Sequence, residues 1–180
     1  MSTLHVENLK GLSSGGNANK IIVPSGQTID ASAGTLVPSA GAVVQYQYRS
    51  PDNTGFSSSS STFVDLTDYY VDITPKKSNN ILVFTTTVWH LPTGTSGAYD
   101  RFRVVDSNNS DAVWNLTNFI GSGGYLDTVW ENVTIMHANT AGTTNTMRLQ
   151  LQVRVDGGGT MNMNWSSNET KTVAVMEIAQ

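Results

Sequence analysis

The chain has 180 residues, 38% of them hydrophobic and 8% aromatic, which is enough to bury the core of one main domain with an appendage. Its net charge is −4 and its ten Lys and Arg residues are scattered along the sequence, which disfavours nucleic acid as a partner because phosphate binding needs concentrated positive charge. There is no cysteine, which excludes disulfides and thiolate metal sites, and no apolar run approaches membrane-spanning length, so we expect no membrane insertion.

Residues 1–42 are expected to form an extended arm rather than a folded domain. Gly, Ser, Ala and Asn dominate this segment, and Pro24, Gly34 and Pro38 interrupt its short apolar clusters. Because the arm buries too little side chain to fold alone, we expect it to pack against its own oligomer or another protein. No basic stretch precedes an apolar segment at its start, so we expect no signal peptide. The predicted attachment residues are Ile21, Ile22, Val23, Ile29, Leu36 and Val37.

Beyond the arm the sequence predicts short strands. A strand at 43–48 is followed by a Ser-rich segment at 50–61, which we expect to be a surface loop, and by a strand at 62–73 that Pro75 ends. Residues 81–89 are apolar or β-branched at almost every position, which is typical of a strand buried on both faces. We expect the second face of this strand to lie against a neighbouring subunit.

The clearest alternation is at residues 147–155, where odd positions are apolar and even positions polar. This period of two predicts a strand with one buried face and one wet face. No segment shows an amphipathic helical pattern, so the predicted fold is all-β: a jelly-roll β-sandwich over residues 43–180 with an extended N-terminal arm. Further strands are expected at 99–105, 112–117, 128–136, 160–165 and 172–178.

Charged residues make up only 13% of the chain, against an ordinary share of about a quarter. Together with strands that are apolar on both faces, this leaves more β-surface than one core can cover. We therefore predict self-association.

Three stretches of the sandwich region resemble a family of short phage and prophage tail-fibre-like proteins: residues 73–83 (ITPKKSNNILV), 125–128 (YLDT) and 175–180 (VMEIAQ). Residues 17–30 and 33–38 of the arm resemble the start of many marine-phage virion proteins. The family usually has a proline shortly after its Tyr-x-Asp element, where this chain reads DTVW. The resemblance implies a trimeric jelly-roll module, similar in outline to the tumour-necrosis-factor and complement globular-head (C1q-like) folds, displayed on a phage particle.

A receptor surface is predicted beside a glycine-rich loop at residues 121–124. Indole rings can stack on sugar rings, although we expect two or three of the four tryptophans, Trp89, Trp114, Trp130 and Trp165, to lie in the core. Trp114 and Trp130 flank the loop, and loops vary independently of their scaffold, as a recognition surface must. The candidate surface is Trp114, Tyr125 and Trp130, with a host-surface glycan as the ligand considered for it.

Catalytic and metal-binding patterns are missing from the sequence. His5, His90 and His137 do not stand at metal-ligand spacings, and no Gly-x-Ser-x-Gly elbow exposes a nucleophilic serine. We therefore expect no enzymatic activity, no metal and no cofactor.

Four carboxylates could have either a functional or a structural role. Asp65, Asp68 and Asp72 cluster around one strand, where paired carboxylates can cleave glycosides or bind calcium, although solvated strand-edge charges are the commoner case. Glu177 lies in an apolar strand and needs a hydrogen-bond or cationic partner if it is buried. We expect Glu177 to be structural, with its partner at a subunit contact.

These observations favour a non-enzymatic bacteriophage virion protein: a trimeric fibre-type protein that binds other virion proteins through residues 1–42 and displays its sandwich for host adhesion. The alternative is a capsid decoration or cement protein. A free carbohydrate-binding module is a third hypothesis, and a glycosidase acting through Asp65 or Asp68 is a fourth. The expected location is the virion, after synthesis in the cytoplasm of the infected bacterium.

Overall fold

The computed structural model describes residues 13–16, 21–27, 38–51, 55–93, 99–117, 131–163 and 171–180. The chain divides into two compact units, Met1–Val37 and Pro38–Gln180. In the first unit, the described residues include a turn closed by a hydrogen bond from Gln27 N to Pro24 O (3.1 Å). Gly26 has a φ of 81° in this turn, a left-handed conformation that favours glycine.

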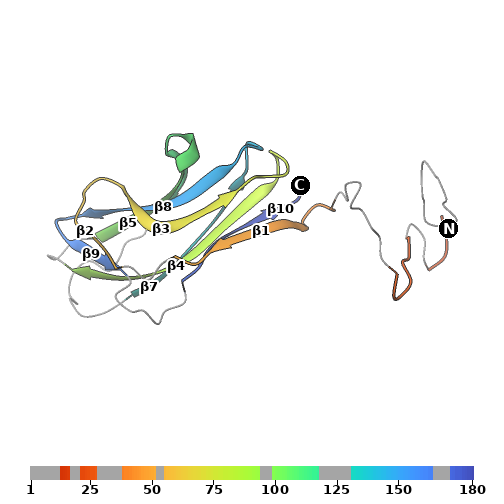
Figure 1. Cartoon of the computed structure of the whole chain (residues 1–180), viewed down its shortest axis with the longest axis horizontal. Helices are drawn as coiled ribbons and strands as arrows, with labels where there is room; N and C mark the ends of the chain where they lie inside the picture. Colours follow the sequence, from red (N-terminus) through yellow and green to blue (C-terminus); the bar gives the residue numbers. More distant parts are fainter. Residues whose placement is uncertain are drawn as a thin grey trace. The chain divides into compact units, whose positions relative to one another are not determined.

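The described residues of the second unit form ten strands and one short 3₁₀ helix at Ser107–Asn109 (Figure 1). Runs of β-branched and aromatic residues form the longer strands, and turns rich in Gly, Asn and Ser separate them. The strands are β1 (Val43–Arg49), β2 (Phe56–Ser58), β3 (Val64–Ile73), β4 (Ile81–Thr93), β5 (Tyr99–Asp106), β6 (Ala112–Thr117), β7 (Glu131–Thr140), β8 (Met147–Asp156), β9 (Thr160–Met163) and β10 (Val173–Ile178).

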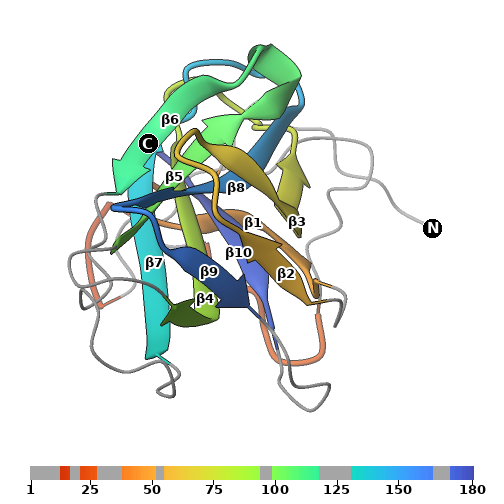
Figure 2. The ribbon, with the colours of Figure 1, turned by 90° about the vertical axis from the view of Figure 1, so that its left-hand side faces the viewer.

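The strands form two antiparallel sheets that pack face to face (Figure 1, Figure 2). Sheet A has the order β1-β10-β4-β9-β2, with β7 paired to β4 as well. Sheet B has the order β3-β8-β5-β6. The first strand of the unit thus pairs with the last, and the third pairs with the eighth. This winding of the chain from both ends is that of a jelly roll, and it confirms the predicted all-β fold class.

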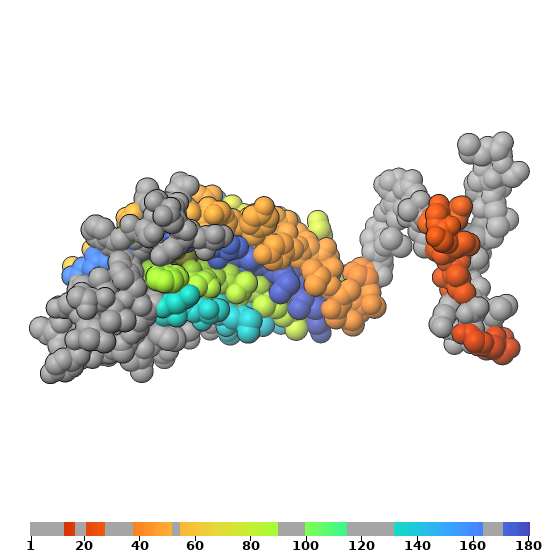
Figure 3. Space-filling view, turned by 90° about the horizontal axis from the view of Figure 1, so that it is seen from below, coloured from red at the N-terminus to blue at the C-terminus, as the bar shows by residue number. Residues whose placement is uncertain are grey.

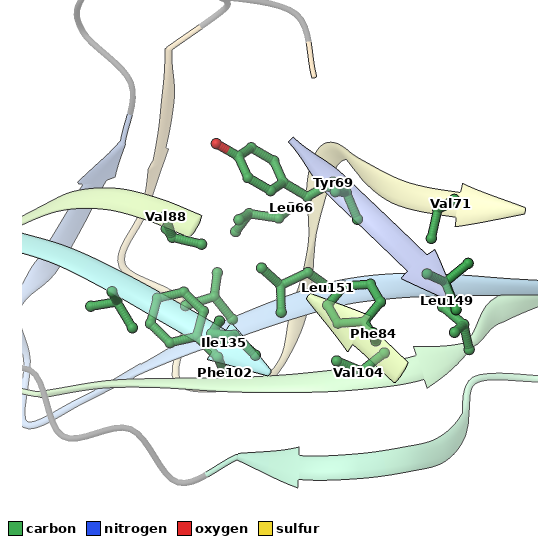
Figure 4. Packing of buried hydrophobic residues seen from close by; sticks show 14 of the residues in the cluster. Leu66, Tyr69, Val71, Phe84, Val88, Phe102, Val104, Ile135, Leu149 and Leu151 are labelled. Carbon is green, nitrogen blue, oxygen red and sulfur yellow. The ribbon is translucent and has the colours of Figure 1, made fainter. Parts of the chain in front are cut away.

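The core fills the space between the two sheets (Figure 4). Sheet A contributes Phe84 and Val88 from β4, and sheet B contributes Phe102 from β5 and Leu149 and Leu151 from β8, all fully buried. Burial of each such side chain contributes about 1.5–3 kcal/mol, so the core determines which side of every strand faces inward.

Some boundaries differ from those predicted. The strand β2 lies inside the expected Ser-rich loop, because it pairs with β9, a distant partner that the local sequence does not indicate. The strand β7 extends to Thr140 because it pairs with β4 along its whole length. The compact unit begins at Pro38, before the predicted end of the arm: Gly41 N donates to Ala179 O, and Ala179 N donates to Ala42 O, both at 2.9 Å.

The predicted wet face of β8 is wrong at the centre of the strand, where Gln150 and Gln152 are buried. The neighbouring strand β3 bulges opposite them. Gln150 Nε2 donates to the main-chain oxygens of Leu66 (2.8 Å) and Tyr69 (3.3 Å), which lie within this bulge. The alternating pattern correctly separates the two sides of the strand, but it cannot reveal that a bulged neighbour covers the polar side.

Glu177 joins β10 to two other parts of the sandwich. Its carboxylate is fully buried and accepts hydrogen bonds from Asn80 Nδ2 (2.6 Å), Lys76 N (2.8 Å) and Gln45 Nε2 (2.5 Å). These donors come from the same chain, not from a neighbouring subunit as expected. Burial raises the pKa of Glu177, but the hydrogen bonds from Asn80, Gln45 and the main-chain N–H groups of Lys76 and Lys77 together bring the pKa below its usual value.

We expect Glu177→Gln to lower the free energy of unfolding at pH 7 by about 1–3 kcal/mol, because an amide cannot accept all these hydrogen bonds. A carboxylate with a depressed pKa stabilises the fold above its unfolded-state pKa, and this contribution is lost as the pH falls through the folded-state pKa. Denaturant unfolding should therefore show a smaller difference between the two proteins at about pH 3 than at pH 7. Asp72→Asn is the control, because Asp72 is a half-exposed carboxylate. If Glu177→Gln lowers the free energy of unfolding by the same amount at about pH 3 as at pH 7, the proposed role of the Glu177 carboxylate is contradicted.

Candidate functional site

The outer side of sheet A carries no charged side chain among the described residues of β1, β10, β4 and β7. The strand register places Tyr46 opposite Met176, which lies opposite Val83, which lies opposite Ala138, so the four strands contribute to one continuous row. Figure 3 shows these strands side by side, coloured orange, blue, yellow-green and cyan. We call this surface the neutral face: Tyr46, Tyr48, Ile81, Val83, Thr85, Thr87, Trp89, Asn132, Thr134, Met136, Ala138, Thr140, Ala174, Met176 and Ile178.

Large side chains of the neutral face are exposed in the single chain. The exposed fraction is 72% for Met136, 68% for Tyr48 and 51% for Tyr46, and the two tyrosine rings stack with centroids 6.0 Å apart. Single exposed apolar residues are normal on a protein surface, but a contiguous apolar face marks an interaction site. The strand β4 is thus buried on one side within the chain and half exposed on the side where the sequence predicted a neighbouring subunit.

The outer side of sheet B has the opposite character. Four of the five arginines of the chain lie there on β5 and β8. Arg148 forms a two-pronged ion pair with Asp72 (2.8 and 2.9 Å), and Arg101 pairs with Asp156 (2.6 Å). The hydrogen bond to Asp72 raises the pKa of Arg148. Partly exposed ion pairs contribute at most about 1 kcal/mol each, so their main consequence is a hydrated surface. We call this surface the charged face: Asp65, Asp72, Arg101, Arg103, Arg148, Arg154 and Asp156.

A hollow of about 240 Å³ lies between β1 and β3, which are the edge strands of the two sheets on this side of the sandwich. The sequence does not predict this hollow, because its walls come from strands of different sheets and no local pattern links them. The residues that line it are Gln47, Tyr48, Arg49, Tyr70, Val71 and Asp72.

The three aspartates of β3 do not form a shared carboxylate site. Asp65 accepts a hydrogen bond from Gln152 (2.8 Å), Asp68 pairs with Arg49 (2.6 Å), and Asp72 pairs with Arg148. Asp68 has a φ of 65° within the β3 bulge, which turns it away from the regular alternation. Within the described ranges, no group of three or more His, Cys, Asp or Glu residues could hold a metal ion, and no helix is long and apolar enough to cross a membrane.

Of the predicted receptor residues, Trp114 lies on β6, is half-buried and packs against the core. Its ring meets the His137 ring edge-on, with centroids 5.3 Å apart, and Asn139 Nδ2 donates to its main-chain oxygen. Tyr125 and Trp130 lie outside the described residues, so the receptor surface stays a prediction. Trp165 also lies outside them, and Trp89 is on the neutral face rather than in the core.

Three of the predicted attachment residues can be placed. Ile21, Ile22 and Val23 are exposed within the first unit, with exposed fractions of 53%, 57% and 39%. Three consecutive exposed β-branched residues are available to a partner surface. The others, Ile29, Leu36 and Val37, lie outside the described residues.

Comparison with known proteins yields structural similarity only. No protein-family model matches the chain, and no curated protein matches its sequence. The VP2 subviral particle of infectious bursal disease virus is 11% identical, with a TM-score of 0.45, over 87% of this chain and 41% of the VP2 chain. Eiger TNF from S. frugiperda is 11% identical, with a TM-score of 0.44, over 75% of this chain and 92% of that chain. This chain therefore spans about two fifths of the VP2 chain that it matches.

The contact between Trp114 and His137 should affect the pKa of the His137 imidazole. Burial lowers the pKa of His137 below its usual value, because the charged imidazolium is poorly hydrated there. We expect amide and imidazole NMR signals to give a His137 pKa below about 6.5, and Trp114→Ala to raise it by exposing the ring. A His137 pKa that is unchanged in Trp114→Ala would show that the indole does not shield the imidazole.

Proposed function

We propose that this chain is a non-enzymatic structural protein of a bacteriophage virion, a fibre-type homotrimer whose copies associate through the neutral face. The segment before Pro38 holds the trimer to other virion proteins, and the sandwich is displayed for host adhesion. The neutral face is the observation that carries this proposal, because a solvent-facing sheet surface is ordinarily polar and charged on at least some of its strands.

The contrast between the two outer faces supports association through sheet A. The charged face supplies seven charged side chains to water, whereas the described neutral face supplies none. Depletion of charge and enrichment in Tyr and Met are typical of the centre of an interface. Burial of this surface contributes about 25 cal/mol per Å² of apolar area. A trimer closes when one part of the neutral face packs against a different part of the next copy's face around a three-fold axis.

The virion assignment is supported by the sequence resemblance to tail-fibre-like proteins, and the attachment role by the exposed Ile21–Val23 cluster. A capsid decoration protein remains the second candidate, because it would use the same trimer and the same arm. A density map of the purified particle distinguishes the fibre protein from the decoration protein. Trimers at capsid lattice positions would reject the fibre assignment and support capsid decoration.

Met136→Asp should convert the trimer to monomers, because it places a charge at the most exposed large apolar side chain of the neutral face, on β7 opposite Thr85. Light scattering coupled to size-exclusion chromatography measures the mass, and circular dichroism verifies that the fold is retained. Val113→Asp is the matched control, since Val113 is also an exposed apolar strand residue but lies on β6 in sheet B. A Met136→Asp protein with the mass of the wild-type assembly would reject the neutral face as the interface.

Ile22→Asp should leave the trimer mass unchanged and abolish incorporation into particles, because it places a charge in the apolar attachment cluster. Ser14→Asp is the control, as Ser14 is an exposed polar residue of the same unit. Phage grown with each variant can be purified and probed for the protein by mass spectrometry. Normal incorporation of both variants would contradict the attachment role of Ile21–Val23.

A further inference from the structure

The hollow between β1 and β3 presents hydrogen-bonding groups to a ligand. In the described sheets, β1 pairs only with β10, and β3 pairs only with β8. Main-chain N–H and C=O groups on the free sides of both strands therefore border the hollow. The exposed side chain of Gln47 adds an amide that can donate and accept hydrogen bonds.

The charged groups around the hollow are balanced. Arg49 pairs with Asp68, and Arg148 pairs with Asp72. Both guanidinium groups lie over the Tyr70 ring, 4.3 and 4.1 Å from its centroid, which holds this wall in place. With two positive and two negative groups, a phosphate, a carboxylate or an ammonium group gains no net attraction.

Hydrogen-bonding capacity remains in the hollow after these pairings. The Arg49 Nε–H group is buried and has no acceptor among the described residues. This nitrogen has almost no accessible surface, so a ligand oxygen in the hollow would accept from the exposed part of the Arg49 side chain, which is about one third exposed, and not from Nε. Across the hollow, the carboxylate of Asp72 is half exposed and can accept a hydroxyl hydrogen.

An uncharged sugar ring fits this combination of groups. Its hydroxyls both donate and accept hydrogen bonds, and its C–H faces can pack against the part of the Tyr48 ring that a neighbouring copy leaves uncovered at the β1 edge of the neutral face. Val71 is the only aliphatic residue in the lining, which disfavours an apolar ligand. The volume of about 240 Å³ lies below the roughly 300–1,000 Å³ of pockets for drug-sized ligands, so it suits a single sugar residue.

We propose that the hollow binds one uncharged sugar residue of a glycan, with the ring on Tyr48 and the hydroxyls hydrogen-bonded to Gln47, Arg49 and Asp72. This inference rests on the proposed adhesion function and deepens it by naming the class of receptor. It also locates glycan binding on β1 and β3 rather than at Trp114, Tyr125 and Trp130.

The full-length protein, labelled with ¹⁵N, is titrated with the methyl glycosides of glucose, galactose, mannose and N-acetylglucosamine. At least one sugar should shift the amide signals of residues 47–49 and 70–72. Gln47→Ala and Asp72→Asn should each weaken binding about threefold to tenfold, as expected for the loss of one hydrogen bond. Asp65→Asn, on the same strand but outside the lining, should bind like the wild type. Tyr48 is left intact because it also belongs to the neutral face.

Two outcomes overturn the inference. The first is that none of the four sugars shifts these signals, or that the shifts surround Trp114 instead. The second is that the signals respond to a short uncharged strand peptide, such as Thr-Val-Thr-Val-Thr, and not to sugars, which would identify strand addition at the free edge of β1. If the protein is a trimer but binds none of the sugars, only this inference is rejected. If the wild-type protein is a monomer that binds sugar in the hollow, the proposed trimer is rejected and the sugar site is retained.

Discussion

A β-sandwich buries one side of each sheet in its core, and the two outer sides must then be made compatible with their surroundings. This chain does so in two different ways. Sheet B carries arginines and aspartates that pair across neighbouring strands, as in Arg148 with Asp72, and water can hydrate them. Sheet A presents tyrosine, methionine, valine and threonine over four strands without a described charge. The difference between the two sides is the reason why sheet A, and not sheet B, is the proposed contact surface.

Buried polar groups set the register that keeps these two outer sides distinct. A shift of one residue in β8 or β10 would exchange the inward and outward side chains. Gln150 opposes such a shift, because its amide satisfies main-chain oxygens of the β3 bulge, and Glu177 opposes it in β10, because its carboxylate accepts hydrogen bonds from Asn80 and Gln45. Misplacing either group would leave a buried polar atom unpaired, at a cost of about 1–3 kcal/mol.

The sequence was sufficient to predict those features of the fold that depend on local patterns. Alternation and β-branched runs located most strands, and together with the missing helical pattern they predicted the jelly roll. Features that depend on pairing were not accessible: the burial of Gln150 requires the β3 bulge, and β2 requires β9. The hollow was missed for the same reason, since Gln47 and Tyr70 are brought together only by the closure of the sandwich. The aspartates that seemed clustered in sequence are separated by their individual partners.

Tyr48 connects the two proposed interactions. It is part of the neutral face through its register with Ala174, and it also lines the hollow beside Arg49. A tyrosine that is exposed in the single chain loses side-chain entropy when a ligand packs on it, and association of the chains would remove part of that cost beforehand. By linkage, a ligand that binds the assembled form more tightly must strengthen the assembly by the same factor. Glycan binding and trimer formation would therefore be coupled through a single side chain at the edge of sheet A.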